Sequence, residues 1–282
     1  MDGKWNQRYP KTFAKSNQKV TFVTMGNMKD ISGLTMAAFV PEKISQYDLV
    51  IDGTQSHEPV LVFFENDLEK TFVRSYSQFE QEHGIQLLSN EKPKSVKFLV
   101  PVIDSDFIPH SLFDASLLEE YGKFILDDGL SPLLSVDFPA TGSVMVYREY
   151  LPSIKLLTHI FPQAQRVPFP TVFVKNLQDR AQSLGDKIVG VHVAHDFVAM
   201  AVLRNGSFAY YHQFQINNID EFNYYLIQIL KMLDSSPAQI SMILSGDIND
   251  GDPFSQRITK YTRNIQFIQS PTCVSLVAGL KV

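Results

Sequence analysis

The chain has 282 residues, of which 44% are hydrophobic and 20% are charged, and its formal net charge is −5. This is the composition of a globular protein with one large domain or two ordinary ones, and it excludes an intrinsically disordered chain. General nucleic-acid binding needs clustered positive charge, which the acidic balance argues against. The single cysteine, Cys273, cannot form an internal disulfide and lacks the spacing of a metal site.

The beginning of the chain carries no apolar stretch typical of a targeting signal. Residues 1–19 are polar, and no run in the sequence approaches the roughly 18 apolar residues of a membrane span. We therefore expect a cytoplasmic protein without a membrane segment. Residues 19–25 predict a short strand, and no clear periodicity follows up to Pro41.

The next part of the chain predicts strands separated by turns, followed by helices. Pro101 should place its strand at a sheet edge or near a strand end, because proline donates no ladder hydrogen bond. Ser111 is a candidate N-cap for a helix that extends to about residue 126. A second helix is expected over 150–162, where Pro162 stops it. The expected strands are residues 49–52, 60–64, 71–79, 96–103 and 143–150.

Two prolines within Arg166–Thr171 indicate a domain boundary, because proline resists both helix interiors and central strands. The chain is therefore divided into an N-terminal half, residues 1–170 with an extension of uncertain placement, and a C-terminal half, residues 171–282. A connecting helix is expected at 172–184.

The C-terminal half has the sharper pattern. Asn205-Gly206 predicts a two-residue hairpin turn, because both residues tolerate positive φ. Asn218 and Glu221 form a capping-box pattern ahead of an amphipathic helix, and a short helix is expected at 253–262. The expected strands are residues 188–194, 197–203, 207–216, 241–247 and 264–269.

Three antiparallel strands, a helix, a strand, a helix and a strand are the element order of a ribonuclease H-like unit. The stretch LVID…VLVFF…TFVRSYSQF in the N-terminal half has the same pattern as VGVHVA…MAVL…SFAYYHQF in the C-terminal half. We therefore predict an α/β protein of two tandem ribonuclease H-like units, in the actin-like ATPase arrangement of actin, sugar kinases and Hsp70.

Two long stretches also carry a family resemblance. VKFLVPVIDSDFIPHSLFD and VHVAHDFVAMAVLRNGSFAYYHQFQINNIDEFNYYLIQIL, with ILSGDI after the second, resemble a family of uncharacterised bacterial proteins over about residues 95–280. That family is a domain of unknown function with an actin-like ATPase, ribonuclease H-like fold. The resemblance implies the fold, and it implies no particular reaction.

Proteins of the actin-like superfamily hold ATP with glycine-containing loops, where backbone N–H groups approach phosphate oxygens and an Asp orients Mg²⁺-bound water. Asp52, Gly53 and Thr54 resemble the first of these loops. Asp-Gly is also one of the commonest turn dipeptides between strands.

The other two loops are weaker matches. Asp196 lies where the second phosphate loop is expected, but Phe197 places a bulky side chain where backbone should approach phosphate. Gly246 is one glycine at the adenosine loop, where two are usual. The pattern favours a non-catalytic binding or assembly module that has a protein partner and no cofactor or metal. The alternative is an ATPase or phosphotransferase that binds ATP with Mg²⁺ through Asp52, Gly53, Thr54, Asp196 and Gly246. Either kind of protein could self-associate.

Other chemistries have less support. A ribonuclease H-type nuclease needs three or four carboxylates, and Asp52 with Glu65 lacks an evident third. His192 and His195 are three residues apart on a strand, so they project to opposite faces and should be core or edge residues. The sequence has no GxGxxG, GxxxxGK[ST] or GxSxG motif.

Overall fold

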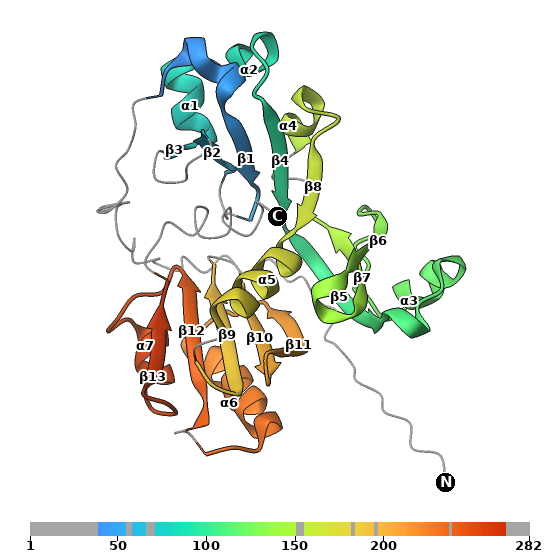
Figure 1. The fold of residues 1–282 in the computed structure, drawn as a ribbon, viewed down its shortest axis with the longest axis vertical. Coiled ribbons are helices and arrows are strands. Elements are labelled where there is room, and N and C mark those ends of the chain that lie inside the picture. The colour runs from blue at the N-terminus through green and yellow to red at the C-terminus, as the bar shows by residue number, and fades with distance from the viewer. Residues whose placement is uncertain are drawn as a thin grey trace, which may run out of the picture. The chain divides into compact units, whose positions relative to one another are not determined.

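Two five-stranded sheets with the same strand order make up most of the fold (Figure 1). In the computed structural model the described residues all belong to one compact unit, Gly33–Val282. The expected strand at 19–25 and the residues His195, Asp196 and Cys273 lie outside them. The structure describes residues 39–54, 58–65, 71–150, 155–181, 184–194, 197–236 and 239–268.

The sheet of the N-terminal half has the order β3-β2-β1-β4-β8. β1 pairs antiparallel with β2, and β2 with β3, whereas β4 is parallel to both β1 and β8. Its strands are β1 (Asp48–Asp52), β2 (Val60–Phe64), β3 (Thr71–Ser75), β4 (Ser95–Val100) and β8 (Gln165–Pro168).

The sheet of the C-terminal half repeats this plan in the order β11-β10-β9-β12-β13. Asn205 and Gly206 both have positive φ, 52° and 75°, as the predicted hairpin turn requires. The repeated order confirms two tandem ribonuclease H-like units. The strands are β9 (Lys187–Val193), β10 (Val198–Arg204), β11 (Ser207–Phe214), β12 (Ser241–Gly246) and β13 (Asn264–Phe267).

Helices cover both faces of the C-terminal sheet, with α5 on one face and α6 on the other (Figure 1). Residues that alternate along a strand enter different clusters: Ile188 of β9 joins the cluster of α5, and Val189 joins that of α6. Burial on both faces explains why these strands are almost continuously apolar. The helices of this half are α5 (Phe169–Ala181), α6 (Ile219–Leu233) and α7 (Pro253–Ile258).

The N-terminal sheet is also buried on both faces. Leu49 and Ile51 of β1 pack with Phe79, whereas Val50 between them joins the cluster that contains Phe169 of α5. The latter cluster therefore includes residues of both halves. The helical elements beside this sheet are the 3₁₀-helix η1 (Pro41–Gln46), α1 (Tyr76–His83), α2 (Gln86–Asn90) and α4 (Lys155–Ile160).

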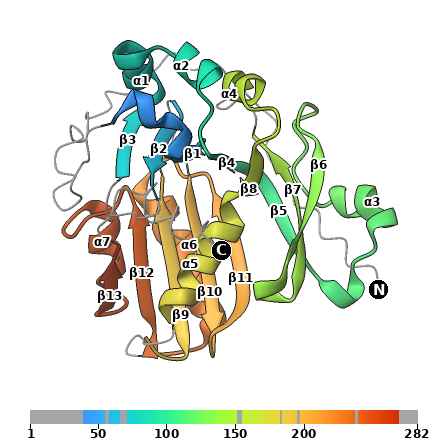
Figure 2. The same ribbon diagram turned by 45° about the horizontal axis from the view of Figure 1, so that its top comes forward.

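A three-stranded antiparallel sheet, absent from the predictions as a unit, is inserted between β4 and α4 in the order β5-β7-β6 (Figure 2). The predicted strand 96–103 is two strands, because Pro101 separates β4 from β5, which belongs to this second sheet. The strands are β5 (Val102–Pro109), β6 (Leu133–Phe138) and β7 (Ser143–Glu149). The connection between β5 and β6 contains η2 (His110–Leu112), η3 (Ala115–Leu117) and α3 (Leu118–Gly122).

Two predictions, the strand over 71–79 and the helix from Ser111, were wrong because helix N-caps lie at other residues than expected. The strand expected over 71–79 ends at Ser75, whose side chain accepts from the Gln78 backbone N–H while the Gln78 side chain accepts from the Ser75 N–H. This capping box starts α1. The single helix expected from Ser111 to about residue 126 is replaced by η2, η3 and α3. Asp114, instead of Ser111, is an N-cap, and it caps η3 by accepting from the Ser116 N–H.

The prolines of Arg166–Thr171 were expected to interrupt regular structure, but both lie within regular elements. Pro168 ends β8, an edge strand, and Pro170 lies in the first turn of α5, where no N–H is needed. The connecting helix therefore begins at Phe169 instead of residue 172. The proposed division between residues 170 and 171 stays a prediction.

Candidate functional site

The predicted nucleotide-binding residues within the described chain lie at the carboxyl ends of central strands. Asp52 is the last residue of β1, and Gly246 is the last residue of β12. In open α/β sheets, ligands commonly bind beside such strand ends. Asp196 lies in the segment between β9 and β10 that the structure does not describe.

The Asp52-Gly53-Thr54 turn closes on itself. Asp52 is fully buried, and its Oδ1 accepts from the Thr54 backbone N–H at 2.9 Å and from the Thr54 hydroxyl at 2.6 Å. The Gly53 N–H donates to the Leu99 carbonyl at 2.9 Å, which continues the pairing of β1 with β4. Both N–H groups therefore have acceptors within the protein.

Gly246 lies where two backbones come very close together. Its φ is 86°, and a Cβ atom added to it would lie 1.9 Å from the Val193 carbonyl oxygen. That oxygen accepts from the Asp247 N–H at 2.7 Å, and the Ile248 N–H donates to the Gly246 carbonyl at 2.8 Å. The close approach of β12 to β9 therefore explains why this position holds a glycine, without a bound nucleotide.

Phe197 belongs to the apolar core at the end of β9. Its ring is buried and lies 5.6 Å from that of Phe169 in an edge-on arrangement. The Ala194 N–H donates to the Phe197 carbonyl at 2.9 Å. The bulky residue noted in the sequence therefore packs inside the protein.

His192 is a core histidine, as predicted. Only 1% of the residue is exposed, its Nδ1 lies 3.0 Å from the Ser245 hydroxyl oxygen, and its ring lies 4.8 Å from that of Phe169. It thereby connects β9 to β12. Burial lowers the pKa of His192 to about 3, so the imidazole is neutral in the folded protein at neutral pH.

We expect acid to destabilise the protein through His192. Its pKa lies below the ordinary value of 6.5, so the unfolded chain binds more protons between these pH values and stability falls as the pH falls. The loss from about pH 7.5 to about pH 5 should be roughly 2 kcal/mol from this group. Urea denaturation followed by circular dichroism at both pH values measures it.

The matched variant for this measurement is His192→Leu, which removes the titrating group. The substitution itself lowers stability by an amount that does not depend on pH. The free energy of unfolding of the variant should therefore change by roughly 2 kcal/mol less than that of the parent between the two pH values. Equal pH dependence in both proteins would contradict the expectation.

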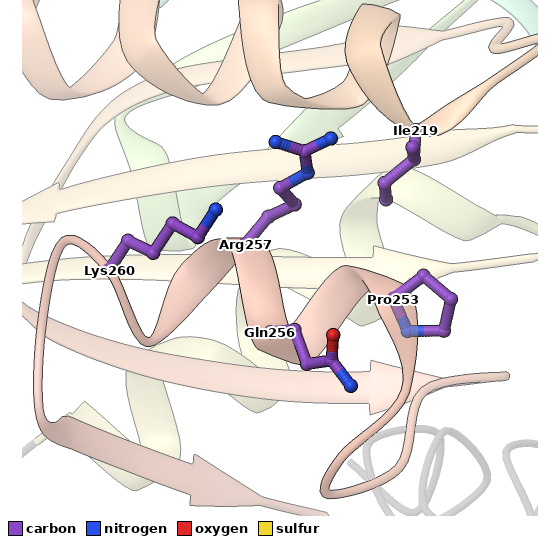
Figure 3. A pocket seen from close by; sticks show the side chains of 5 residues that line it. All are labelled: Ile219, Pro253, Gln256, Arg257 and Lys260. Carbon is purple, nitrogen blue, oxygen red and sulfur yellow. The ribbon is translucent and has the colours of Figure 1, made fainter.

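The described residues also form a surface hollow of about 320 Å³, which contains none of the predicted nucleotide-binding residues. Figure 3 shows its lining side chains around α7 and the start of α6. The Arg257 guanidinium in it pairs with Asp220 at 2.7 Å. The lining residues are Ile219, Pro253, Gln256, Arg257 and Lys260.

Two further features concern only the described part of the chain. There, no group of three or more His, Cys, Asp or Glu side chains could hold a metal ion. Among the helices of the same residues, none is long and apolar enough to cross a membrane.

A buried carboxylate was missed from the sequence. Glu149, at the end of β7, is fully buried, and its Oε2 pairs with Arg166 Nη1 of β8 at 2.9 Å. Within the described chain, its other oxygen has no hydrogen-bond partner. Burial raises the pKa of Glu149, while Arg166 and Tyr147 oppose the rise. The sequence contained a signal for this burial. Met145, Tyr147 and Glu149 lie on one face of the strand, and the first two belong to the hydrophobic core.

Comparison with known proteins gives the family of the chain. A family model described as "Protein of unknown function (DUF3822)" matches residues 49–265. No curated protein matches the chain.

Two solved structures have a similar fold. A protein from Bacteroides thetaiotaomicron with an actin-like ATPase fold and unknown function is 13% identical, with a TM-score of 0.72 over 86% of this chain and 98% of that one. The structure of a PilM–PilN type IV pilus biogenesis complex is 11% identical, with a TM-score of 0.55 over 85% of this chain and 100% of that one. The predicted actin-like ATPase arrangement is therefore confirmed.

Proposed function

Because the chain belongs to the family described as "Protein of unknown function (DUF3822)" and has the actin-like ATPase fold, we propose that it is a non-catalytic protein-binding or assembly module of the cytoplasm. In this proposal the two ribonuclease H-like halves are retained as a scaffold, and no nucleotide cofactor is used.

The observation that carries the proposal is the hydrogen bonding of the strand ends. A phosphate needs backbone N–H groups that point toward it. The N–H groups of five residues at these ends instead donate to acceptors within the protein at 2.7–2.9 Å. These residues are Gly53, Thr54, Ala194, Asp247 and Ile248.

A protein partner is supported by a structure of the same fold. PilM, a protein with which this chain shares the fold, was solved in a complex with PilN. We extend to this chain only the general idea that the scaffold associates with another protein.

One observation favours the alternative of a nucleotide-binding ATPase or phosphotransferase. Asp52 is a buried carboxylate at the end of β1, followed by Gly53 and Thr54, which are the residue types of a phosphate loop. With Asp196 and Gly246 they would form the binding set for ATP and Mg²⁺.

Isothermal titration with ATP and Mg²⁺ separates the two functions. We expect no binding tighter than about 1 mM and no phosphate release, because the strand-end donors are already occupied. An actin-like ATPase in the same buffer serves as the positive control. Micromolar binding with turnover that Asp52→Ala abolishes, at an unchanged thermal midpoint, would establish the alternative.

A further inference from the structure

The connection between β5 and β6 exposes a concentration of large apolar side chains. Among the described residues, five of the nine exposed large hydrophobic side chains lie within residues 112–130. Leu130 is 90% exposed and Phe124 is 83% exposed. Scattered exposed apolar residues are normal, whereas a concentration of them marks an interaction surface. The five residues, which we call the apolar display, are Leu112, Leu117, Phe124, Leu126 and Leu130.

Hydrogen bonds hold the C-terminal part of this connection. The Leu126 N–H donates to Asp104 Oδ2 at 3.0 Å, and the Leu130 N–H donates to Asp128 Oδ1 at 3.0 Å. Arg148 of β7 donates to the Ser131 carbonyl at 2.7 Å. A backbone tied to the inserted sheet loses little conformational entropy when a partner binds.

The N-terminal part is held by Tyr121. Its hydroxyl donates to the Leu112 carbonyl at 3.1 Å and accepts from the Asp114 N–H at 3.1 Å. Its ring stacks on Phe113 with centroids 5.6 Å apart. Hydrogen bonds therefore fix the backbone of the connection that carries the apolar display. This connection lies around α3, beside the inserted sheet (Figure 2).

The surroundings of the display are strongly acidic. Residues 104–137 contain eight carboxylates and one lysine, a formal charge of −7 with His110 neutral, against −5 for the whole chain. The lysine, Lys123, pairs with Glu120, and Arg148 of β7, which lies outside this range, pairs with Asp127 at 3.2 Å. The carboxylates are Asp104, Asp106, Asp114, Glu119, Glu120, Asp127, Asp128 and Asp137.

We infer that the apolar display docks a cationic segment of a partner protein that carries its own apolar side chains. Apolar contact would supply affinity at about 25 cal/mol per Å² of buried area, offset by the cost of association. The acidic surroundings would select positively charged partners and accelerate the encounter. The same charge repels nucleic acids and anionic lipids. The inference rests on the proposed protein-binding function and names its surface and the chemistry of its partner.

A random peptide library displayed on phage is the probe for this surface. Selection uses the full chain, after depletion on the double variant Phe124→Ser/Leu130→Ser. We expect the enriched peptides to combine apolar residues with an excess of Lys and Arg. Because both replaced side chains are exposed, the variant should keep the thermal midpoint of the parent.

Fluorescence anisotropy then measures one enriched peptide. The double variant should lose about tenfold or more in affinity, and added salt should weaken binding to the parent. A second variant, Glu119→Lys/Asp137→Lys, should also bind more weakly, because it reverses charge without touching the display. Tyr224→Ser, at another exposed aromatic on α6, is the control and should stay within about twofold of the parent.

Enrichment of acidic or uncharged peptides would overturn the inference, as would equal affinity in the parent and the double variant. Binding of nucleic acid or phosphatidylserine vesicles at the display would overturn it as well. If a peptide bound elsewhere on the protein, the apolar display would be rejected as the docking surface, but the proposed protein-binding function would stand. ATP turnover would instead remove the proposed non-catalytic function, whatever the peptides do.

Discussion

Gly246→Ala should lower the free energy of unfolding by roughly 3 kcal/mol or more, because it combines backbone strain with a steric clash. Gly246 has a φ of 86°, which an alanine adopts only with strain, and its new Cβ would lie 1.9 Å from the Val193 carbonyl oxygen. The clash would separate β12 from β9, the central strand of the C-terminal sheet. Urea denaturation followed by circular dichroism gives the difference.

Gly206→Ala is the matched control. Gly206 also has a positive φ, 75°, but a Cβ atom there would have nothing within 4 Å. It should lose only the cost of the backbone conformation, roughly 1–2 kcal/mol. If Gly246→Ala were no more damaging than Gly206→Ala, close strand contact would not explain Gly246, and its assignment to a nucleotide loop would become more attractive.

Arg166→Met should cost about 3 kcal/mol near neutral pH. The substitution removes the cation that pairs with Glu149 at 2.9 Å and leaves a fully buried carboxylate without its charged partner. Because the Arg166 side chain is 41% exposed, we expect the lower end of the range for breaking a buried pair. Chemical denaturation of the variant and the parent measures the cost.

The pH dependence identifies the buried carboxylate as the cause. Burial raises the pKa of Glu149 above its ordinary value of 4.5, and loss of Arg166 should raise it further. The folded variant then holds a proton that the unfolded chain releases, so its stability relative to that of the parent should fall as the pH rises through the pKa of Glu149.

A double variant provides the control for this pair. Glu149→Gln removes the charge, so Arg166→Met/Glu149→Gln should recover much of the loss and show less pH dependence. A stability difference between Arg166→Met and the parent that is the same at about pH 8 and at about pH 5 would contradict this explanation.

Local signals in the sequence were sufficient for the C-terminal half. Asn205-Gly206 specified the hairpin through its tolerance of positive φ. Asn218 accepts the Asp220 and Glu221 N–H groups as an N-cap, whereas Glu221 accepts from the Asn217 N–H and so does not complete the predicted capping box. Each of these signals acts over a few residues, so a single sequence contains all the information required. The repeated strand pattern then led to the fold of both halves.

The inserted sheet could not be predicted in the same way. β5 and β6 flank β7 but do not pair with each other, and the pattern of their connection predicted one helix where the structure has η2, η3 and α3. Whether Pro101 lies at a strand end or between two sheets depends on pairing with distant strands. Likewise, Glu149 and Arg166 are brought together only when β7 and β8 take their places.

The sequence by itself determined the two-fold repeat of the scaffold and the residue types at its strand ends, because strand periodicity, turn chemistry and helix caps are local properties. The tertiary structure decided what those strand ends do. The Gly53 N–H meets the Leu99 carbonyl, and Gly246 faces Val193, only because separate strands lie side by side. A backbone donor can bind a phosphate or continue a sheet, and the neighbouring strand makes that choice.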